Sequence, residues 1–260
     1  MMNIRITVIS MMMLAGAVFG NAVFEGFETY TPGTSINNQG DFTTVNGSSQ
    51  QLAVISTNTA SFFNGGSQSL RYLDNDTSSL ASFSVNYNPV VSPAGGPLVV
   101  SFDFKIINGV WNPTFWARDA GGTAAITLKF YDQTTATMGN NANNAGLVDV
   151  SSYALSTDLW YRAEITIGDI SGSSDTYDLR VLEEDGGTGT EVINVTGLGF
   201  RYDVSDISSF AFNAGGAIAG RSGTEYYIDN INVIPEPATL GMLGAGFGGL
   251  FLLRHRICSK

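Results

Sequence analysis

Short segments in which apolar and polar residues alternate run through most of the chain. This period of two is typical of β-strands with one buried face. No window between the two ends of the chain keeps a helical period. The clearest strands are predicted at 98–107, 125–131, 160–167, 176–182 and 226–233, with further candidates at 23–28, 51–55, 69–73, 81–87, 192–195 and 209–213.

Turn signals separate these segments throughout. Examples are Pro93-Ala-Gly-Gly-Pro97, Asp119-Ala-Gly-Gly and Glu184-Asp-Gly-Gly. About twelve short strands punctuated in this way are typical of an all-β domain. We therefore predict a two-sheet antiparallel jelly-roll sandwich spanning residues 23–234.

The N-terminus departs from this pattern. Residues 6–19 are nearly all apolar, Arg5 precedes them, and the small residues Gly20 and Ala22 follow. This arrangement predicts a secretory signal peptide at residues 1–22, which the Sec translocon would read and a peptidase would cleave after Ala22. The alternative is an uncleaved membrane anchor.

The C-terminus carries a second apolar run. Residues 238–253 hold no charge, and Arg254, Arg256 and Lys260 follow at once. An uncharged run followed by basic residues predicts a single transmembrane helix in the inner membrane with a cytoplasmic tail. Just before it stand Pro235, Glu236 and Pro237, where the two prolines favour a stiff extended joint.

This three-part ending, Pro-Glu-Pro at 235–237, an apolar span, and Arg254 with Arg256, resembles the PEP-CTERM sorting signal of Gram-negative bacteria. The resemblance implies that residues 235–260 are a sorting segment recognised by an exosortase, a membrane transpeptidase. It also implies a chain that is first anchored in the inner membrane and then moved to the cell surface, the extracellular space or a biofilm matrix.

Charge and rare residues exclude several functions. Between residues 23 and 237, eight basic side chains face all 23 acidic ones, so the net charge there is −15. Such a surface disfavours nucleic acid as a partner. The single cysteine, Cys258, and the single histidine, His255, both lie in the tail. The domain therefore has no disulfide, no Ser-His-Asp or Cys-His arrangement and no histidine-based zinc site.

The remaining class of catalysis uses carboxylates, as glycosidases do. Such enzymes need an acid and a base or nucleophile on facing strands. The closest run is Glu183-Glu184-Asp185, but Gly186 and Gly187 follow it, which predicts a solvated hairpin turn. We therefore do not expect an enzyme, although a lyase that uses tyrosine and arginine stays open.

A candidate ligand-binding segment surrounds Pro113, where Trp111, Asn112, Trp116 and Arg118 combine aromatic rings with hydrogen-bonding groups. Exposed aromatic faces stack on sugar rings. The proline predicts that part of the segment is a loop or an edge strand. The competing interpretation, which we favour, is that the two tryptophans cap the core of the sandwich.

A structural Ca²⁺ is predicted where the first and last strands of such a sandwich meet. Asp229 falls on the same alternating face as Tyr227, Ile231 and Val233, so its carboxylate needs a partner. Glu25 or Glu28 of the first strand would complete an oxygen site with Asp229 and backbone carbonyls. Pairing with arginine or backbone amides is the alternative.

Three strand patterns, 66–73, 159–167 and 227–233, resemble concanavalin A-like lectin and laminin G-like modules and galactose-binding-like carbohydrate-binding modules. By analogy of fold, the domain is expected to be non-catalytic and either glycan-binding or structural, with extracellular polysaccharide as its partner. The alternative function is a carbohydrate-active enzyme on the same fold, a glycosidase or a polysaccharide lyase.

Overall fold

The computed structural model describes eleven stretches of the chain: residues 23–45, 51–57, 66–75, 83–88, 98–108, 113–131, 134–168, 170, 175–186, 188–214 and 223–235. Within them the protein is all-β, apart from a 3₁₀ turn at Ala142–Asn144. The strands form two antiparallel sheets that pack face to face, as predicted.

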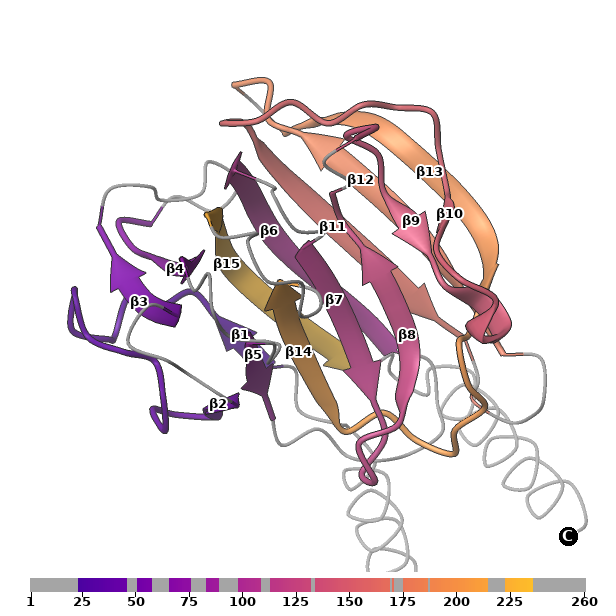
Figure 1. The fold of residues 1–260 in the computed structure, drawn as a ribbon, viewed down its shortest axis with the longest axis horizontal. Coiled ribbons are helices and arrows are strands. Elements are labelled where there is room, and N and C mark those ends of the chain that lie inside the picture. Colours follow the sequence, from indigo (N-terminus) through magenta and orange to yellow (C-terminus); the bar gives the residue numbers. More distant parts are fainter. Residues whose placement is uncertain are drawn as a thin grey trace, which may run out of the picture.

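Sheet A is the rear layer in Figure 1 and has the strand order β13-β12-β11-β6-β15-β4-β3, with β1 added along β15. Its strands are β1 (Val23–Glu25), β3 (Gln51–Ser56), β4 (Ser69–Asp74), β6 (Leu98–Asn108), β11 (Trp160–Ile167), β12 (Thr176–Glu183), β13 (Thr190–Gly199) and β15 (Thr224–Pro235).

Sheet B is the front layer in Figure 1, with the order β10-β9-β8-β7-β14-β5-β2. Its strands are β2 (Phe42–Val45), β5 (Phe83–Tyr87), β7 (Pro113–Arg118), β8 (Ala124–Lys129), β9 (Gly139–Asn140), β10 (Val148–Asp149) and β14 (Ser209–Ala214). Strands that lie side by side in sheet B can be far apart in the sequence. For example, β14 lies between β5 and β7, so the strand order differs from the order along the chain.

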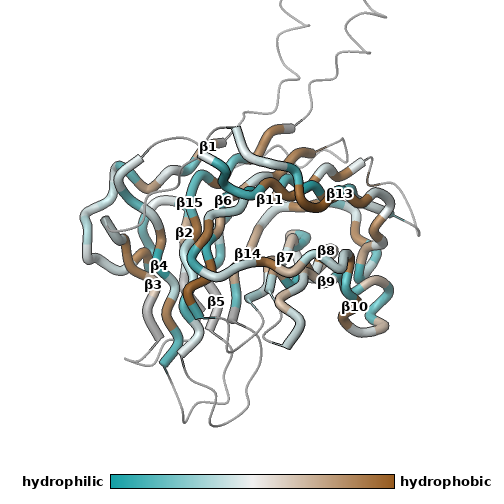
Figure 2. The backbone as a smooth tube through the Cα atoms, turned by 90° about the horizontal axis from the view of Figure 1, so that it is seen from above, coloured by the Kyte–Doolittle hydropathy of each residue, from teal (hydrophilic) through white to brown (hydrophobic). Residues whose placement is uncertain are grey.

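Figure 2 shows the two layers of the sandwich from above. The core lies between the two sheets, where alternate residues of each strand meet. Phe102 of sheet A packs against Phe115 and Phe212 of sheet B, with ring centroids 5.0 Å and 5.1 Å apart. Aromatic pairs at this spacing add to the apolar area removed from water. This aromatic layer stabilises the domain through packing.

Every segment that alternation predicts as a strand contains one in the structure, although β1 and β8 end earlier than predicted and residues 81–82 lie outside the described residues. Four further strands were not predicted: β2, β9 and β10 are short, and β7 begins with a proline. The expectation that the segment around Pro113 is a loop or an edge is wrong for residues 113–118. Pro113 is the first residue of β7, a position that needs no ladder donor, and β7 lies between β8 and β14.

A bulge in β15 corrects the predicted faces of the last strand. Asn230 has a φ of +49°. From one paired position to the next, β15 advances three residues, from Asp229 to Asn232, while β6 advances only two, from Asp103 to Ser101. One extra residue switches the side on which later residues point. Ile231 and Val233 therefore point into the core, whereas Tyr227 and Asp229 lie on the outer face of sheet A.

The two predicted membrane-associated segments lie outside the described residues. Residues 1–22 and 236–260 are among those not described, so the signal peptide and the transmembrane helix stay predictions. Among the residues that are described, no helix has the length and apolar character needed to cross a membrane.

Candidate functional site

The β7–β8 hairpin places two of the predicted ligand-binding residues on one surface. Phe115 and Ala117 of β7 point into the core, so the alternate residues Trp116 and Arg118 point to the outer face of sheet B. The turn that follows is closed by hydrogen bonds between Asp119 and residues 122 and 123. Gly122 adopts a φ of +85°, which glycine accepts without steric cost.

A shallow, open depression of about 260 Å³ lies beside this hairpin and is called the pocket below. It is smaller than the ~300–1,000 Å³ typical of sites for drug-sized ligands, so only a small chemical group fits in it. Its walls combine two aromatic rings, two guanidinium groups and the small residues of the turn: Trp116, Arg118, Gly122, Thr123, Ala124, Arg201 and Tyr202.

Each guanidinium in the pocket lies over an aromatic ring. Cζ of Arg118 is 4.4 Å from the ring centroid of Trp116, and Cζ of Arg201 is 5.0 Å from that of Tyr202. Cation–π contacts of this kind restrict where each side chain can point. The pocket is thereby built from two ordered cation–aromatic pairs.

Neutral oxygens hold the two arginines in place. Nη1 of Arg118 donates to Oδ1 of Asn86 at 3.3 Å, and Nε of Arg201 donates to Oδ1 of Asn144 at 3.1 Å. The backbone amide of Arg201 also donates to the carbonyl of Ala125 at 2.7 Å, which ties the segment after β13 to β8. Burial lowers the pKa of Arg118, because desolvation disfavours the charged form.

The structure corrects the predicted position of Trp116 and adds Arg201 and Tyr202 to the residues that sequence predicted for this site. Trp116 does not cap the core, since it lies on the outer face and outside the core cluster. Trp111 and Asn112 fall outside the described residues. Arg201 and Tyr202 were missed, because only the fold brings the segment after β13 to the start of β8, and an arginine next to a tyrosine is a weak signal.

The predicted calcium site combines Asp229 with either Glu25 or Glu28, and the structure does pair β1 with β15. Glu25 accepts the amide of Phe27 at 2.8 Å and the hydroxyl of Tyr30 at 2.9 Å. Glu28 accepts the amides of Ser67 and Gln68 at 2.7 Å and 2.8 Å.

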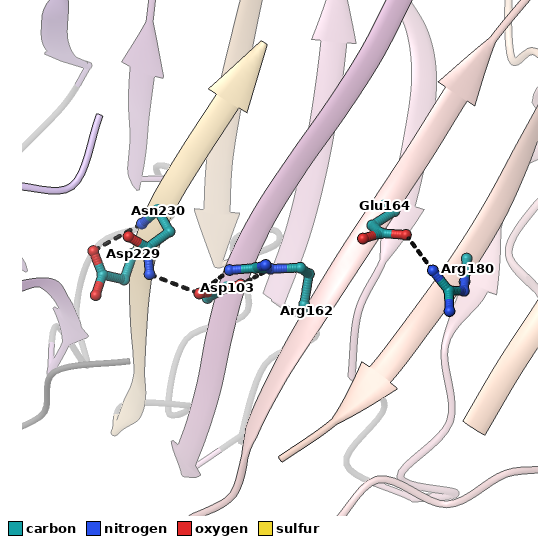
Figure 3. A network of polar contacts seen from close by, with 6 residues as sticks. All are labelled: Asp103, Arg162, Glu164, Arg180, Asp229 and Asn230. Atoms are coloured by element: carbon teal, nitrogen blue, oxygen red, sulfur yellow. Dashed lines mark hydrogen bonds and ion pairs between the residues drawn. The ribbon is translucent and has the colours of Figure 1, made fainter. Parts of the chain in front are cut away.

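Asp229 belongs to a separate polar network on the outer face of sheet A (Figure 3). Oδ1 of Asp229 accepts the amide of Asn230 at 2.7 Å, and Nδ2 of Asn230 donates to Oδ2 of Asp103 at 2.7 Å. Arg162 pairs with Asp103 from the other side. No group of three or more acidic, histidine or cysteine side chains that could hold a metal ion occurs in the described stretches. The calcium site, which would use two carboxylates and backbone carbonyls, stays a prediction.

The acidic run Glu183–Asp185 does lie at the turn between β12 and β13, as predicted. Glu183, however, is half-buried and is the last residue of β12. Its Oε2 accepts the hydroxyls of Tyr153 at 2.6 Å and Tyr161 at 2.9 Å. Asp185 closes the turn by accepting the amide of Gly189 at 3.1 Å. These contacts give both carboxylates a structural role.

The predicted sorting motif starts where the sandwich ends. Pro235 is the last residue of β15 and lies opposite Leu98 of β6. The remaining motif residues, Glu236, Pro237, Arg254 and Arg256, lie outside the described residues. No structured linker therefore separates the folded domain from Pro-Glu-Pro.

Comparison with protein families identifies the PEP-CTERM protein-sorting motif at residues 233–256, and the predicted resemblance is confirmed. The motif implies export, processing by an exosortase and a location at the cell surface or outside the cell. It covers a short part of the chain and leaves the task of the sandwich undetermined. No curated protein matches the sequence.

Solved structures share the fold. The alginate lyase Aly36B in complex with an alginate trisaccharide has a TM-score of 0.53 at 13% identity, with 85% of this chain and 100% of that one covered. A carbohydrate esterase from the Shiga toxin-encoding bacteriophage phi24B gives 0.52 at 12% identity, covering 84% and 100%. The lectin UEA-II complexed with galactose gives 0.50 at 12% identity, covering 82% and 98%. At these identities the likeness concerns the fold alone.

Proposed function

We propose that the protein is an exosortase-sorted, non-catalytic glycan-binding module of the cell surface or its matrix. The observation that carries this proposal is the pocket lined by Trp116, Arg118, Arg201 and Tyr202. An aromatic ring offers an apolar face to the C–H side of a sugar, and guanidinium groups donate to its oxygens.

The lining of the pocket supports binding over glycoside hydrolysis. A glycosidase needs two carboxyl groups flanking the scissile bond, about 5–10 Å apart. None of the seven residues that line the pocket carries a carboxylate. The acids of the sheet A network and of the β12–β13 turn lie on other elements and are engaged by partners within the chain.

The direct test is a glycan array probed with the full chain, purified in detergent. We expect binding to a subset of glycans and loss of that binding in Trp116→Ala. Phe24→Ala is the matched control, since Phe24 is a 58% exposed aromatic residue on β1 of the other sheet. Absence of any glycan binding by the wild type, or equal binding by both variants, would overturn the proposal.

One observation favours a second candidate, a polysaccharide lyase. Tyr202 presents a phenol next to two guanidiniums. In β-elimination a cation neutralises the uronate carboxylate, a base removes the proton on C5, and the O4 leaving group departs with a proton. Release of unsaturated uronate from polygalacturonate or alginate, detected by ultraviolet absorbance and lost in Tyr202→Phe, would identify this activity. Binding without product would leave the non-catalytic function.

A further inference from the structure

Basic side chains are scarce in this acidic domain, and most of them are neutralised. The structure describes seven of them, and five form an ion pair with a carboxylate: Arg71 with Glu225, Lys105 with Asp158, Lys129 with Asp149, Arg162 with Asp103, and Arg180 with Glu164 and Glu191. Within the described stretches, the other two, Arg118 and Arg201, have no carboxylate partner.

Both unpaired guanidiniums line the same pocket. Their hydrogen-bond acceptors are amide and hydroxyl oxygens, which position a cation without cancelling its charge. Arg118 is also partly desolvated, so its charge lacks both full hydration and a counterion. In a domain with a net charge of −15, this is a local concentration of uncompensated positive charge.

Two carboxylates of the adjoining segments accept backbone amides. Oδ1 of Asp119 accepts the amide of Thr123 at 2.7 Å, and Oδ1 of Asp206 accepts the amide of Ala120 at 3.1 Å. Neither residue lines the pocket. These acids hold the shape of the β7–β8 turn, and the two guanidiniums remain available to an anion from outside the chain.

We propose that the pocket takes an anionic group of an acidic polysaccharide, the carboxylate of a uronate unit or a sulfate ester, between Arg118 and Arg201. The guanidiniums supply charge-assisted hydrogen bonds, for which their planar fork fits carboxylate and sulfate oxygens. Trp116 and Tyr202 supply faces for the sugar ring. The inference rests on the proposed glycan binding and names the class of glycan.

The charge of the rest of the domain sharpens this specificity. A net charge of −15 repels a polyanion over most of the surface, so nonspecific attachment of an acidic chain is disfavoured. Binding of such a chain then requires the pocket. A neutral glycan gains nothing from the two guanidinium charges and should bind more weakly.

The test measures binding of the full chain to polygalacturonate, to the same polymer after reduction of its carboxyl groups, and to dextran sulfate. We expect polygalacturonate to bind and the carboxyl-reduced polymer to bind at least about tenfold more weakly. Arg118→Gln and Arg201→Gln should each weaken binding by about tenfold or more. Arg180→Gln is the matched control, because Arg180 lies on β12 of sheet A. Melting temperatures verify that each variant is folded.

The outcomes separate the two proposals. Equal binding of native and carboxyl-reduced polymer, lost in Trp116→Ala, would leave glycan binding intact and overturn the acidic-glycan inference. Failure of every glycan to bind would overturn both. Binding of dextran sulfate without polygalacturonate would support the inference and identify sulfate esters as the anion. An equal loss in all three arginine variants would overturn it, since the pocket would then have no special role.

Discussion

Arg162 holds Asp103 through two parallel hydrogen bonds, from Nε to Oδ1 at 2.6 Å and from Nη2 to Oδ2 at 3.0 Å. The two residues lie directly opposite each other on β11 and β6, at the centre of sheet A. Asp103 is fully buried. A buried carboxylate of this kind needs such a partner, because an unpaired charge away from water is costly.

Removing that partner should destabilise the domain. Arg162→Gln leaves Asp103 buried with a weaker donor, and we expect a loss of about 2–3 kcal/mol in the free energy of unfolding. For a domain of this size that corresponds to roughly 5–10 °C in melting temperature. Thermal and denaturant unfolding followed by circular dichroism measure both quantities.

The matched control is Arg180→Gln. Arg180 also pairs with two carboxylates, but its side chain is 47% exposed. Exposed pairs contribute at most about 1 kcal/mol. Equal destabilisation by the two substitutions would show that burial of Asp103 does not govern the strength of the pair.

Asn230 has two separable roles in the same network. Its side chain donates to Asp103, and its backbone has the positive φ that the β15 bulge requires. Asn230→Gly removes the hydrogen bond but accepts the backbone conformation, whereas Asn230→Ala removes the bond and adds roughly 1 kcal/mol of backbone strain. We expect the alanine variant to melt below the glycine variant, and both to melt below the wild type. An alanine variant as stable as the glycine variant would contradict a left-handed conformation at this position.

Glu28 should make stability depend on pH. Burial by itself would raise the pKa of Glu28, but hydrogen bonds from the amides of Gln68 and Ser67 and from the Ser67 hydroxyl outweigh it and lower the pKa below its ordinary value of 4.5. A lowered pKa in the folded state stabilises the fold above the unfolded-state value. That contribution is lost as the pH falls through the folded-state pKa.

The measurement compares melting curves of the wild type and Glu28→Gln. We expect the variant to melt at a lower temperature at neutral pH, with a difference that stays constant down to about pH 5 and closes below the ordinary pKa of 4.5. A difference that persists unchanged at pH 3 would show that ionisation of Glu28 is not the cause.

Alternation along the chain predicted the strands and the two-layer fold because strand periodicity follows directly from burial of one face. It failed in β15, since a single left-handed residue, Asn230, shifts the side-chain parity and no local pattern announces it. The proline also favoured a loop or an edge strand in part of the segment around Pro113, because sequence does not show that a proline at the first position of a strand leaves the ladder intact.

The pocket could be predicted only in part. Trp116 and Arg118 stand close together in the sequence, and this combination of an aromatic and a basic residue indicated a ligand-binding segment. Arg201 and Tyr202 are more than eighty residues further on, and tertiary contacts such as the backbone hydrogen bond from Arg201 to Ala125 bring them to the same place. The sequence also does not show which arginines lack a carboxylate partner, because strand register sets the neighbours of each arginine.

The sorting motif offers a test that is independent of the pocket. Pro235 ends β15 in register with Leu98, so the folded domain presents the motif at its boundary. Replacing Pro235, Glu236 and Pro237 by alanine should keep the full-length chain in the inner membrane, because the exosortase would lose its recognition sequence. Fractionation followed by immunoblotting measures the distribution of the chain. Trp116→Ala is the control, and it should reach the surface like the wild type. Normal release of the triple-alanine variant would show that Pro-Glu-Pro is not what directs this chain out of the membrane.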